Sequence, residues 1–159
     1  MISELDKKFM LRAIALAKQG MDNNAGGPFG TVIVKDNEII AEASNCVTST
    51  NDPTAHAEVI AIREACKKLG SFQLDGCTLY TSCEPCPMCL GAIYWARPER
   101  VVYACNRKDA ASVNFDDQLI YDEIDTNIAS RKIPFSQLLR DEALTVFKQW
   151  QEKEDKVVY

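Results

Sequence analysis

The sequence contains one histidine, His56, in 159 residues, and it has no long uninterrupted run of apolar residues. Without such a run it offers no candidate signal peptide or membrane span, so we expect a cytoplasmic protein. It also lacks a basic excess, because 18 lysines and arginines are outnumbered by 23 aspartates and glutamates. Proteins that bind RNA or DNA usually present a basic face. This balance argues against a nucleic-acid partner.

The cysteine count does not suggest a disulfide framework. Seven is an odd number, and no secretory segment accompanies it. We therefore expect reduced thiols, which can serve as metal ligands. A chain of 159 residues is long enough for one hydrophobic core and short for two, so we expect a single domain over residues 1–159.

Two short motifs supply the candidate metal ligands and the candidate catalytic residue. His56-Ala57-Glu58 is followed by Pro85-Cys86-Pro87-Met88-Cys89. One imidazole, one carboxylate and two thiols three residues apart match the H-x-E and P-C-x-x-C signature of zinc deaminases. His56, Cys86 and Cys89 are predicted to bind one Zn²⁺ ion, which leaves a fourth coordination position for water.

Glu58 is predicted to be the catalytic residue. Zinc lowers the pKa of a bound water from about 15.7 to roughly 7, so hydroxide becomes available at neutral pH. Glu58 would take a proton from that water, deliver it to a ring nitrogen of the substrate and help the amine to leave as ammonia. A neutral free base or nucleoside suits the acidic chain better than a polynucleotide.

An alternative from a different class uses Cys83. With Cys86 and Cys89 it makes a C-x-x-C-x-x-C spacing, and with His56 it could form a closed structural zinc site. A fourth protein ligand would displace the water and leave Glu58 without a role. The alternative is therefore a zinc-binding module without turnover. A lone C-x-x-C could also be a redox pair.

The pattern of elements predicts an α/β fold. Expected helices lie at 3–19, 55–66, 86–96 and 142–152, with Gly20 ending the first, and expected strands at 31–34, 38–43, 77–81 and 100–104. A capping cluster at 51–54 places His56 in the first turn of its helix. Alternation of strands and helices predicts parallel crossovers, which bring both metal-binding turns to the carboxyl ends of the strands.

The chain resembles the cytidine deaminase superfamily and, within it, the bacterial guanine deaminases over essentially its whole length. The motifs that carry the resemblance are Gly27-Pro28-Phe29-Gly30, the stretches 51–58 and 81–98, Phe115-Asp116-Asp117, and the terminal Tyr159. The resemblance implies a three-layer α/β/α cytidine deaminase-like domain with a mixed central sheet. It also implies a homodimer in which the C-terminal segment from about residue 130 is exchanged.

For function, the resemblance implies zinc-dependent hydrolytic deamination of guanine to xanthine and ammonia. By similarity, Asn45, Asp117 and Tyr159 hold the purine, Phe29 packs against it, and Trp95 belongs to the substrate site. Guanine presents N–H donors on its Watson–Crick edge, whereas adenine offers an acceptor at the equivalent ring nitrogen. A carboxylate acceptor such as Asp117 would therefore select guanine.

Other substrates remain open at this stage. The alternatives are cytosine, guanosine and tRNA adenosine, and the tRNA adenosine deaminases share the hairpin, the His-Ala-Glu motif and the Pro-Cys-x-x-Cys motif. In the tRNA adenosine deaminases, a Gly-Ala-Ala-Gly-like run usually follows the last of these strands, where this chain has Asp109-Ala110-Ala111-Ser112. Together with the net charge of −5, this difference argues against a tRNA substrate.

Overall fold

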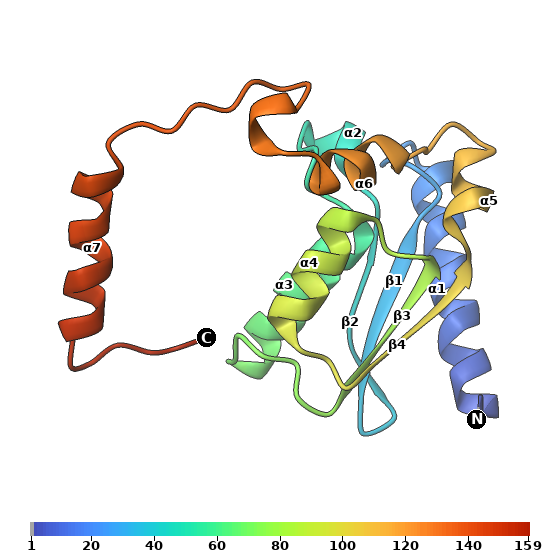
Figure 1. Ribbon diagram of the computed structural model, residues 1–159. Coiled ribbons are helices and arrows are strands. Elements are labelled where there is room, and N and C mark those ends of the chain that lie inside the picture. The colour runs from blue at the N-terminus through green and yellow to red at the C-terminus, as the bar shows by residue number, and fades with distance from the viewer. Residues whose placement is uncertain (1) are drawn as a thin grey trace. The chain divides into compact units, whose positions relative to one another are not determined.

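A four-stranded sheet in the order β2-β1-β3-β4 lies at the centre of the first part of the chain (Figure 1). Its strands are β1 (Gly30–Lys35), β2 (Glu38–Ser44), β3 (Cys77–Cys83) and β4 (Arg100–Cys105). β1 pairs antiparallel with β2 and β3, whereas β3 pairs parallel with β4. The computed structural model describes residues 2–159 and divides into two units after Asp117. The predicted mixed sheet is confirmed.

The β1–β2 hairpin follows from its sequence. β-branched residues fill β1, and the two-residue turn is formed by Asp36 and Asn37. Both have positive φ angles, 51° and 64°, which Asn and Asp tolerate and which two-residue hairpins with a primed turn require.

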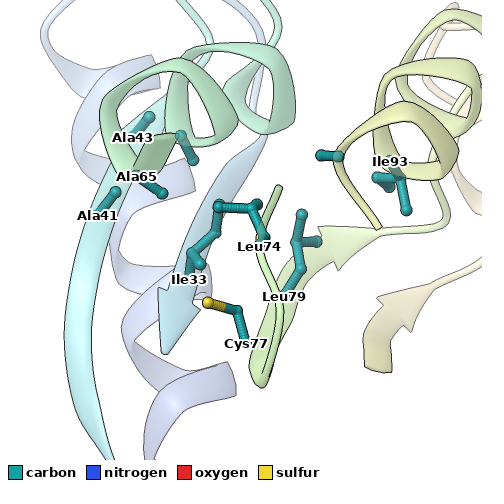
Figure 2. Packing of buried hydrophobic residues seen from close by; sticks show 10 residues of the cluster. Ile33, Ala41, Ala43, Ala65, Leu74, Cys77, Leu79 and Ile93 are labelled. Atoms are coloured by element: carbon teal, nitrogen blue, oxygen red, sulfur yellow. The ribbon is translucent and has the colours of Figure 1, made fainter. Parts of the chain in front are cut away.

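Helices cover both faces of this sheet, as the three-layer prediction requires. α1 (Glu4–Asp22) lies on one face, and α3 (Ala57–Leu69) and α4 (Pro87–Ala96) lie on the other (Figure 1). Strand residues alternate between the two layers. Val32, Val34 and Tyr80 pack with Phe9, Ala13 and Leu16 of α1. Ile33 and Leu79 point to the other side, where Figure 2 shows them in one cluster with Ala65 of α3 and Ile93 of α4.

The first helix begins as expected but ends later. Ser3 and Asp6 form a reciprocal capping box at its start. The prediction that Gly20 ends the helix is wrong, because α1 continues to Asp22. Gly20 instead lies against β2, where an added Cβ would be 2.6 Å from the Cβ of Ser44. This glycine therefore permits close approach of helix and strand.

Asp6 also connects α1 to the sheet. It is 4% exposed, and its Oδ1 accepts a hydrogen bond of 2.6 Å from the Tyr80 hydroxyl of β3. Arg100 of β4 donates to the same oxygen. The Tyr80 hydrogen bond is the largest cause that holds the pKa of Asp6 below its usual range. One carboxylate thus joins three elements.

The remaining elements are short or belong to the second unit. α2 (Val47–Thr50) and α5 (Arg107–Ala111) lie in the first unit, and α6 (Gln118–Asp125), η1 (Ile128–Ser130) and α7 (Arg140–Glu152) lie in the second. α7 begins two residues before the predicted 142–152. Among residues 2–159, no helix combines the length and apolar character needed to cross a bilayer.

Candidate functional site

His56, Cys86 and Cys89 come together at the N-terminal ends of two helices. His56 immediately precedes α3, Cys86 immediately precedes α4, and Cys89 lies in the first turn of α4. Their candidate ligand atoms all lie within 4.8 Å of one another. His56 Nδ1 lies 3.6 Å from Cys86 Sγ and 3.5 Å from Cys89 Sγ. The two sequence motifs therefore form one site.

The spacing of these atoms fits a zinc ion. Zn–S bonds of about 2.3 Å and Zn–N bonds of about 2.0–2.1 Å at a tetrahedral angle separate sulfur from nitrogen by about 3.6 Å. The two observed N–S separations agree with this value. A donor set of one imidazole and two thiols is also typical of catalytic zinc, with its fourth position left to solvent. The predicted ligands are thus suited to Zn²⁺ in both chemistry and geometry.

The start of α3 differs from the prediction in one respect. His56 is the N-cap residue, with extended backbone angles of φ −71° and ψ 150°, and does not lie in the first helical turn. The expected capping cluster is engaged elsewhere, because Asp52 Oδ1 accepts from the N–H and hydroxyl of Thr54 at 2.8 and 2.7 Å. Residues two apart on a regular helix do not share a face. The extended conformation of His56 removes that restriction for His56 and Glu58.

Cys83 does not join the metal ligands. It ends β3, and its thiol donates a 3.7 Å hydrogen bond to the backbone carbonyl of Asn106. Burial raises the pKa of this thiol to about 11, which disfavours the thiolate that a metal would need. Within residues 2–159, the ligand cluster has three members. The closed four-ligand site considered from the sequence is therefore not formed.

The two thiols of the cluster differ in acidity when no metal is bound. A hydrogen bond from Cys89, followed by one with His56, lowers the pKa of Cys86 to about 4 against the opposing effect of burial. The same Cys86–Cys89 bond is the largest cause that raises the pKa of Cys89. The bond to Cys86 raises the pKa of His56. One thiolate is therefore ready for a metal at neutral pH.

Glu58 lies beside the ligands but is not one of them. It is 6% exposed, and its Oε2 lies 3.5 Å from Cys89 Sγ. Its Oε1 accepts a 3.2 Å hydrogen bond from the Thr81 hydroxyl. Burial is the largest cause that raises the pKa of Glu58. A carboxyl group whose pKa is moved toward neutrality is suited to carry protons in both directions.

Asn45 has a fixed orientation in the loop after β2. It is 5% exposed, and its Oδ1 accepts from the backbone N–H groups of Gly27 and Val47 at 3.2 and 3.1 Å. Two donors on one oxygen identify that atom as the carbonyl oxygen of the amide. Within the described chain, the structure records no hydrogen bond from Nδ2. This group can therefore donate to a ligand.

An aromatic pair and a carboxylate complete the candidate substrate side. The rings of Phe29 and Phe115 meet edge to face, with centroids 4.9 Å apart and an interplanar angle of 88°. Asp117 follows Phe115 by two residues. Burial is the largest cause that raises the pKa of Asp117, and the nearby charge of Cys86 adds to it. Asp117 therefore interacts electrostatically with the Cys86 ligand.

Comparison with known protein families agrees with this geometry. The family described as the cytidine and deoxycytidylate deaminase zinc-binding region matches residues 3–105, which include both metal motifs. The chain belongs to this deaminase family. His56, Cys86 and Cys89 form the zinc-binding site typical of the family.

Relatives within the deaminase family differ in how much of the chain they match. A guanine deaminase of Bacillus subtilis is 59% identical over 151 residues, which cover 95% of this chain and 97% of that protein. A tRNA-specific adenosine deaminase of Aquifex aeolicus is 41% identical over 110 residues, or 69% of this chain and 72% of that protein. The X-ray structure of a guanine deaminase from Bacillus subtilis superposes with a TM-score of 0.95 at 56% identity, covering 99% of both chains.

Two residues predicted for the substrate site of this deaminase, Trp95 and Tyr159, are largely exposed in the described chain. Trp95 lies six residues after Cys89 on α4, about 9 Å along the axis and a third of a turn away, and 63% of it is exposed. Tyr159 ends the second unit, with 66% exposure. Their roles stay predictions.

Sequence reasoning missed Thr81 and Phe115 as members of the deaminase site. Thr81 is a polar residue within a buried strand, and Phe115 directly precedes the two aspartates of the quoted motif. Both signals were present in the sequence. Their contacts with Glu58 and Phe29, however, join residues 23 and 86 positions apart, which only the fold reveals.

Proposed function

We propose that this protein catalyses the zinc-dependent hydrolytic deamination of guanine to xanthine and ammonia. The observation that carries the chemistry is a three-ligand metal cluster with an uncoordinated buried carboxyl group beside it. The substrate rests on full-length similarity to a guanine deaminase, whereas the adenosine deaminase matches a smaller part of the chain.

The proposed mechanism divides the work among few residues. A zinc ion held by His56, Cys86 and Cys89 would supply the Lewis-acid activation of a water molecule. Glu58 accepts a proton from the attacking water and passes it to a ring nitrogen of the purine. It then helps the amino group to leave as ammonia. Burial raises the pKa of this carboxyl group and thereby favours uptake of the proton from water.

Four residues of the first unit have proposed roles in binding guanine. The Nδ2 group of Asn45 donates to a purine acceptor, because backbone donors already occupy its Oδ1. Asp117 accepts from the N–H groups of the Watson–Crick edge, which adenine cannot supply at the equivalent ring nitrogen. Phe29 packs against the base, and its ring is held in place by Phe115. Trp95 borders the site.

A substrate panel tests this proposal. Zinc-loaded protein is incubated with guanine, cytosine, adenine, cytidine and guanosine, and the release of ammonia is followed. Ammonia from guanine alone is expected. Release from cytosine or a nucleoside but not from guanine would overturn the substrate and leave the mechanism intact. Tight tRNA binding in a gel shift at moderate salt would support the tRNA adenosine deaminase alternative.

The Glu58→Gln variant separates an enzyme from a structural zinc module. The amide keeps the size of the side chain but cannot carry a proton, so turnover should fall by about 10²- to 10⁴-fold. Zinc content and melting temperature should stay near those of the parent. Glu64→Gln, an exposed substitution on the same helix, is the matched control. Unchanged turnover in Glu58→Gln would contradict the proposed role.

We further propose a homodimer in the cytoplasm, in which the C-terminal segment is exchanged and Tyr159 contacts the purine. Thiolate ligands favour a reducing compartment. Val157 and Val158, next to Tyr159 in the sequence, are 62% and 76% exposed within the chain. Deletion of residues 157–159 should lower guanine turnover without unfolding the protein. Light scattering that gives a monomer mass, or unchanged kinetics after deletion, would contradict this arrangement.

A further inference from the structure

Two buried threonine hydroxyls lie behind Glu58. Thr31 of β1 and Thr81 of β3 are 0% and 1% exposed and are direct partners in the antiparallel β1–β3 pairing. The Thr31 hydroxyl donates to the Thr81 hydroxyl at 3.3 Å, and the Thr81 hydroxyl donates to Glu58 Oε1 at 3.2 Å. A chain of donors therefore starts in the sheet and ends on the proton-carrying carboxyl group.

Packing alone does not require hydroxyls at these positions. Ile33 and Leu79, two residues along from Thr31 and Thr81, are the next partners on the same face of the sheet and are apolar. Valine has nearly the shape of threonine and would fill the same space. A buried hydroxyl costs free energy unless it is hydrogen-bonded. The two hydroxyls avoid this cost through their mutual hydrogen bond and the bond to the carboxyl group. Their presence points to a task beyond packing.

The two oxygens of Glu58 have different surroundings. Oε1 accepts the hydrogen bond from the Thr81 hydroxyl, whereas Oε2 lies 3.5 Å from Cys89 Sγ, on the side of the metal ligands. We propose that Thr81 is a positioning residue that holds Oε1, so that Oε2 is the oxygen that takes and returns the proton, and that Thr31 orients the Thr81 hydroxyl. This inference rests on the proposed deamination and deepens it.

The direction of the hydrogen bonds follows from the groups available. Each threonine hydroxyl has one proton to donate and can accept through its oxygen. Because the Thr31 proton points at the Thr81 oxygen, the Thr81 proton is free to point at Glu58. Thr81 keeps its own proton throughout, and the proton from water enters and leaves through Oε2. Loss of Thr31 would remove one of the two hydrogen bonds that orient the Thr81 hydroxyl.

Thr81→Val and Thr81→Ser form the central experiment. Valine keeps the shape and removes the donor, so kcat for guanine should fall about 10- to 100-fold with KM within about threefold, as expected for a misplaced reacting group. Serine keeps the donor and should restore kcat to within about threefold of the parent. Thr78→Val, a half-buried position on the same strand, is the matched control and should leave kcat unchanged.

A purely structural role of Thr81 predicts different results. It would lower the melting temperature of Thr81→Val with kcat unchanged, or it would affect valine and serine variants equally. Either result overturns the proposal. If Thr81→Val does not fold, Thr31→Val removes only the second hydroxyl and should still lower kcat several-fold. A Thr31→Val variant with the parent's kcat would then overturn it.

A second readout does not depend on turnover. Zinc content should stay at one ion per chain in every variant, and a crystal structure of Thr81→Val should show the Glu58 carboxylate rotated away from its position in the parent. An unmoved carboxylate overturns the positioning role even if kcat falls. If the parent protein releases no ammonia from guanine, the proposed function fails, while the crystallographic comparison still decides the role of Thr81.

Discussion

Gly27 and Asn45 are joined by a 3.2 Å hydrogen bond from the backbone N–H of Gly27 to Oδ1 of Asn45. The neighbouring Gly26 lies even closer to this amide, because an added Cβ there would be 2.1 Å from Oδ1 and 2.6 Å from the backbone oxygen of Asn45. The loop before β1 and the amide after β2 therefore fit together only when residue 26 has no side chain. Orientation of Asn45 depends on this fit.

Gly26→Ala should weaken guanine binding. The methyl group cannot be accommodated unless the Asn45 backbone or amide moves, which would misdirect the Nδ2 donor. Loss of one such hydrogen bond costs about 1–3 kcal/mol, or a rise in KM of about 5- to 150-fold at unchanged zinc content. Steady-state kinetics on guanine and metal analysis provide the measurement.

The chain contains a control for this substitution. Gly91 lies within α4, where an added Cβ meets nothing within 4 Å. Gly91→Ala should leave KM unchanged and stabilise the helix by about 0.5–1 kcal/mol. Equal effects of Gly26→Ala and Gly91→Ala on KM would show that the amide is not positioned by the loop.

Removal of zinc should expose one reactive thiol. In the metal-free site the hydrogen bond from Cys89 lowers the pKa of Cys86 to about 4, so Cys86 is a thiolate at pH 6, where an ordinary thiol with a pKa of about 8.5 is almost fully protonated. Iodoacetamide at pH 6 should therefore modify Cys86 before Cys89, whose pKa is raised. Peptide mass spectrometry after chelation provides the measurement.

Zinc reloading and an internal reference make this test decisive. Zinc should protect both Cys86 and Cys89, because their sulfurs then bind the metal. Cys105 is an exposed thiol outside the ligand cluster and reports general reactivity in the same sample. Labelling of Cys105 ahead of Cys86 in the metal-free protein would contradict the predicted thiolate.

Asp6→Asn should reduce stability in a pH-dependent way. The pKa of Asp6 is lowered in the folded protein, chiefly by the Tyr80 hydrogen bond. A lowered folded-state pKa gives stability that is present above the unfolded pKa of about 3.9 and is lost as the pH falls toward the folded value. The difference in unfolding free energy between parent and Asp6→Asn should thus be larger at pH 7 than at pH 3.

Urea titrations of the metal-free proteins at the two pH values measure this difference. Zinc is omitted because its thiolate ligands also take up protons in acid. Asp22→Asn is the control, since this aspartate forms only an exposed pair with Lys18 and should change stability little at either pH. A difference for Asp6→Asn that does not shrink at pH 3 would contradict the argument.

Local patterns in the sequence were sufficient to predict the metal site and the hairpin. The H-x-E and P-C-x-x-C motifs each identify metal ligands within a few consecutive residues. Asp36 and Asn37 likewise indicate a hairpin turn from two consecutive residues. The prediction for Gly20 is wrong because a glycine near a helix end gives the same local pattern in two cases. It can end the helix, or it can allow a strand to approach closely. Its close approach to Ser44 is a tertiary contact, which the local sequence does not indicate.

Contacts between distant residues account for the rest of what was missed. Nothing near Thr81 in the sequence indicates that its hydroxyl meets Glu58, since the register of β1 against β3 and the entry of α3 must both be known. The opposite case is Cys83, whose three-residue spacing from Cys86 suggested a ligand. The direction of β3 instead places its thiol on the Asn106 carbonyl.

Asp117 offers the sharpest test of substrate choice. Guanine presents two adjacent N–H donors on its Watson–Crick edge, and a carboxylate can accept both. Burial is the largest cause that raises the pKa of this carboxyl group, and the charge of Cys86 adds to it. An amide at this position would keep one acceptor and turn a second donor toward guanine.

Asp117→Asn should therefore lower kcat/KM for guanine by about 10²-fold or more, because a donor that faces a donor loses a hydrogen bond and leaves both groups unsatisfied. Zinc content should not change, since Asp117 is not one of the three ligands. Asp116→Asn, at the exposed neighbouring position, should keep kcat/KM within about twofold, as surface substitutions usually do. If the two variants lose activity equally, Asp117 acts through the loop that carries it and does not read the edge of the base.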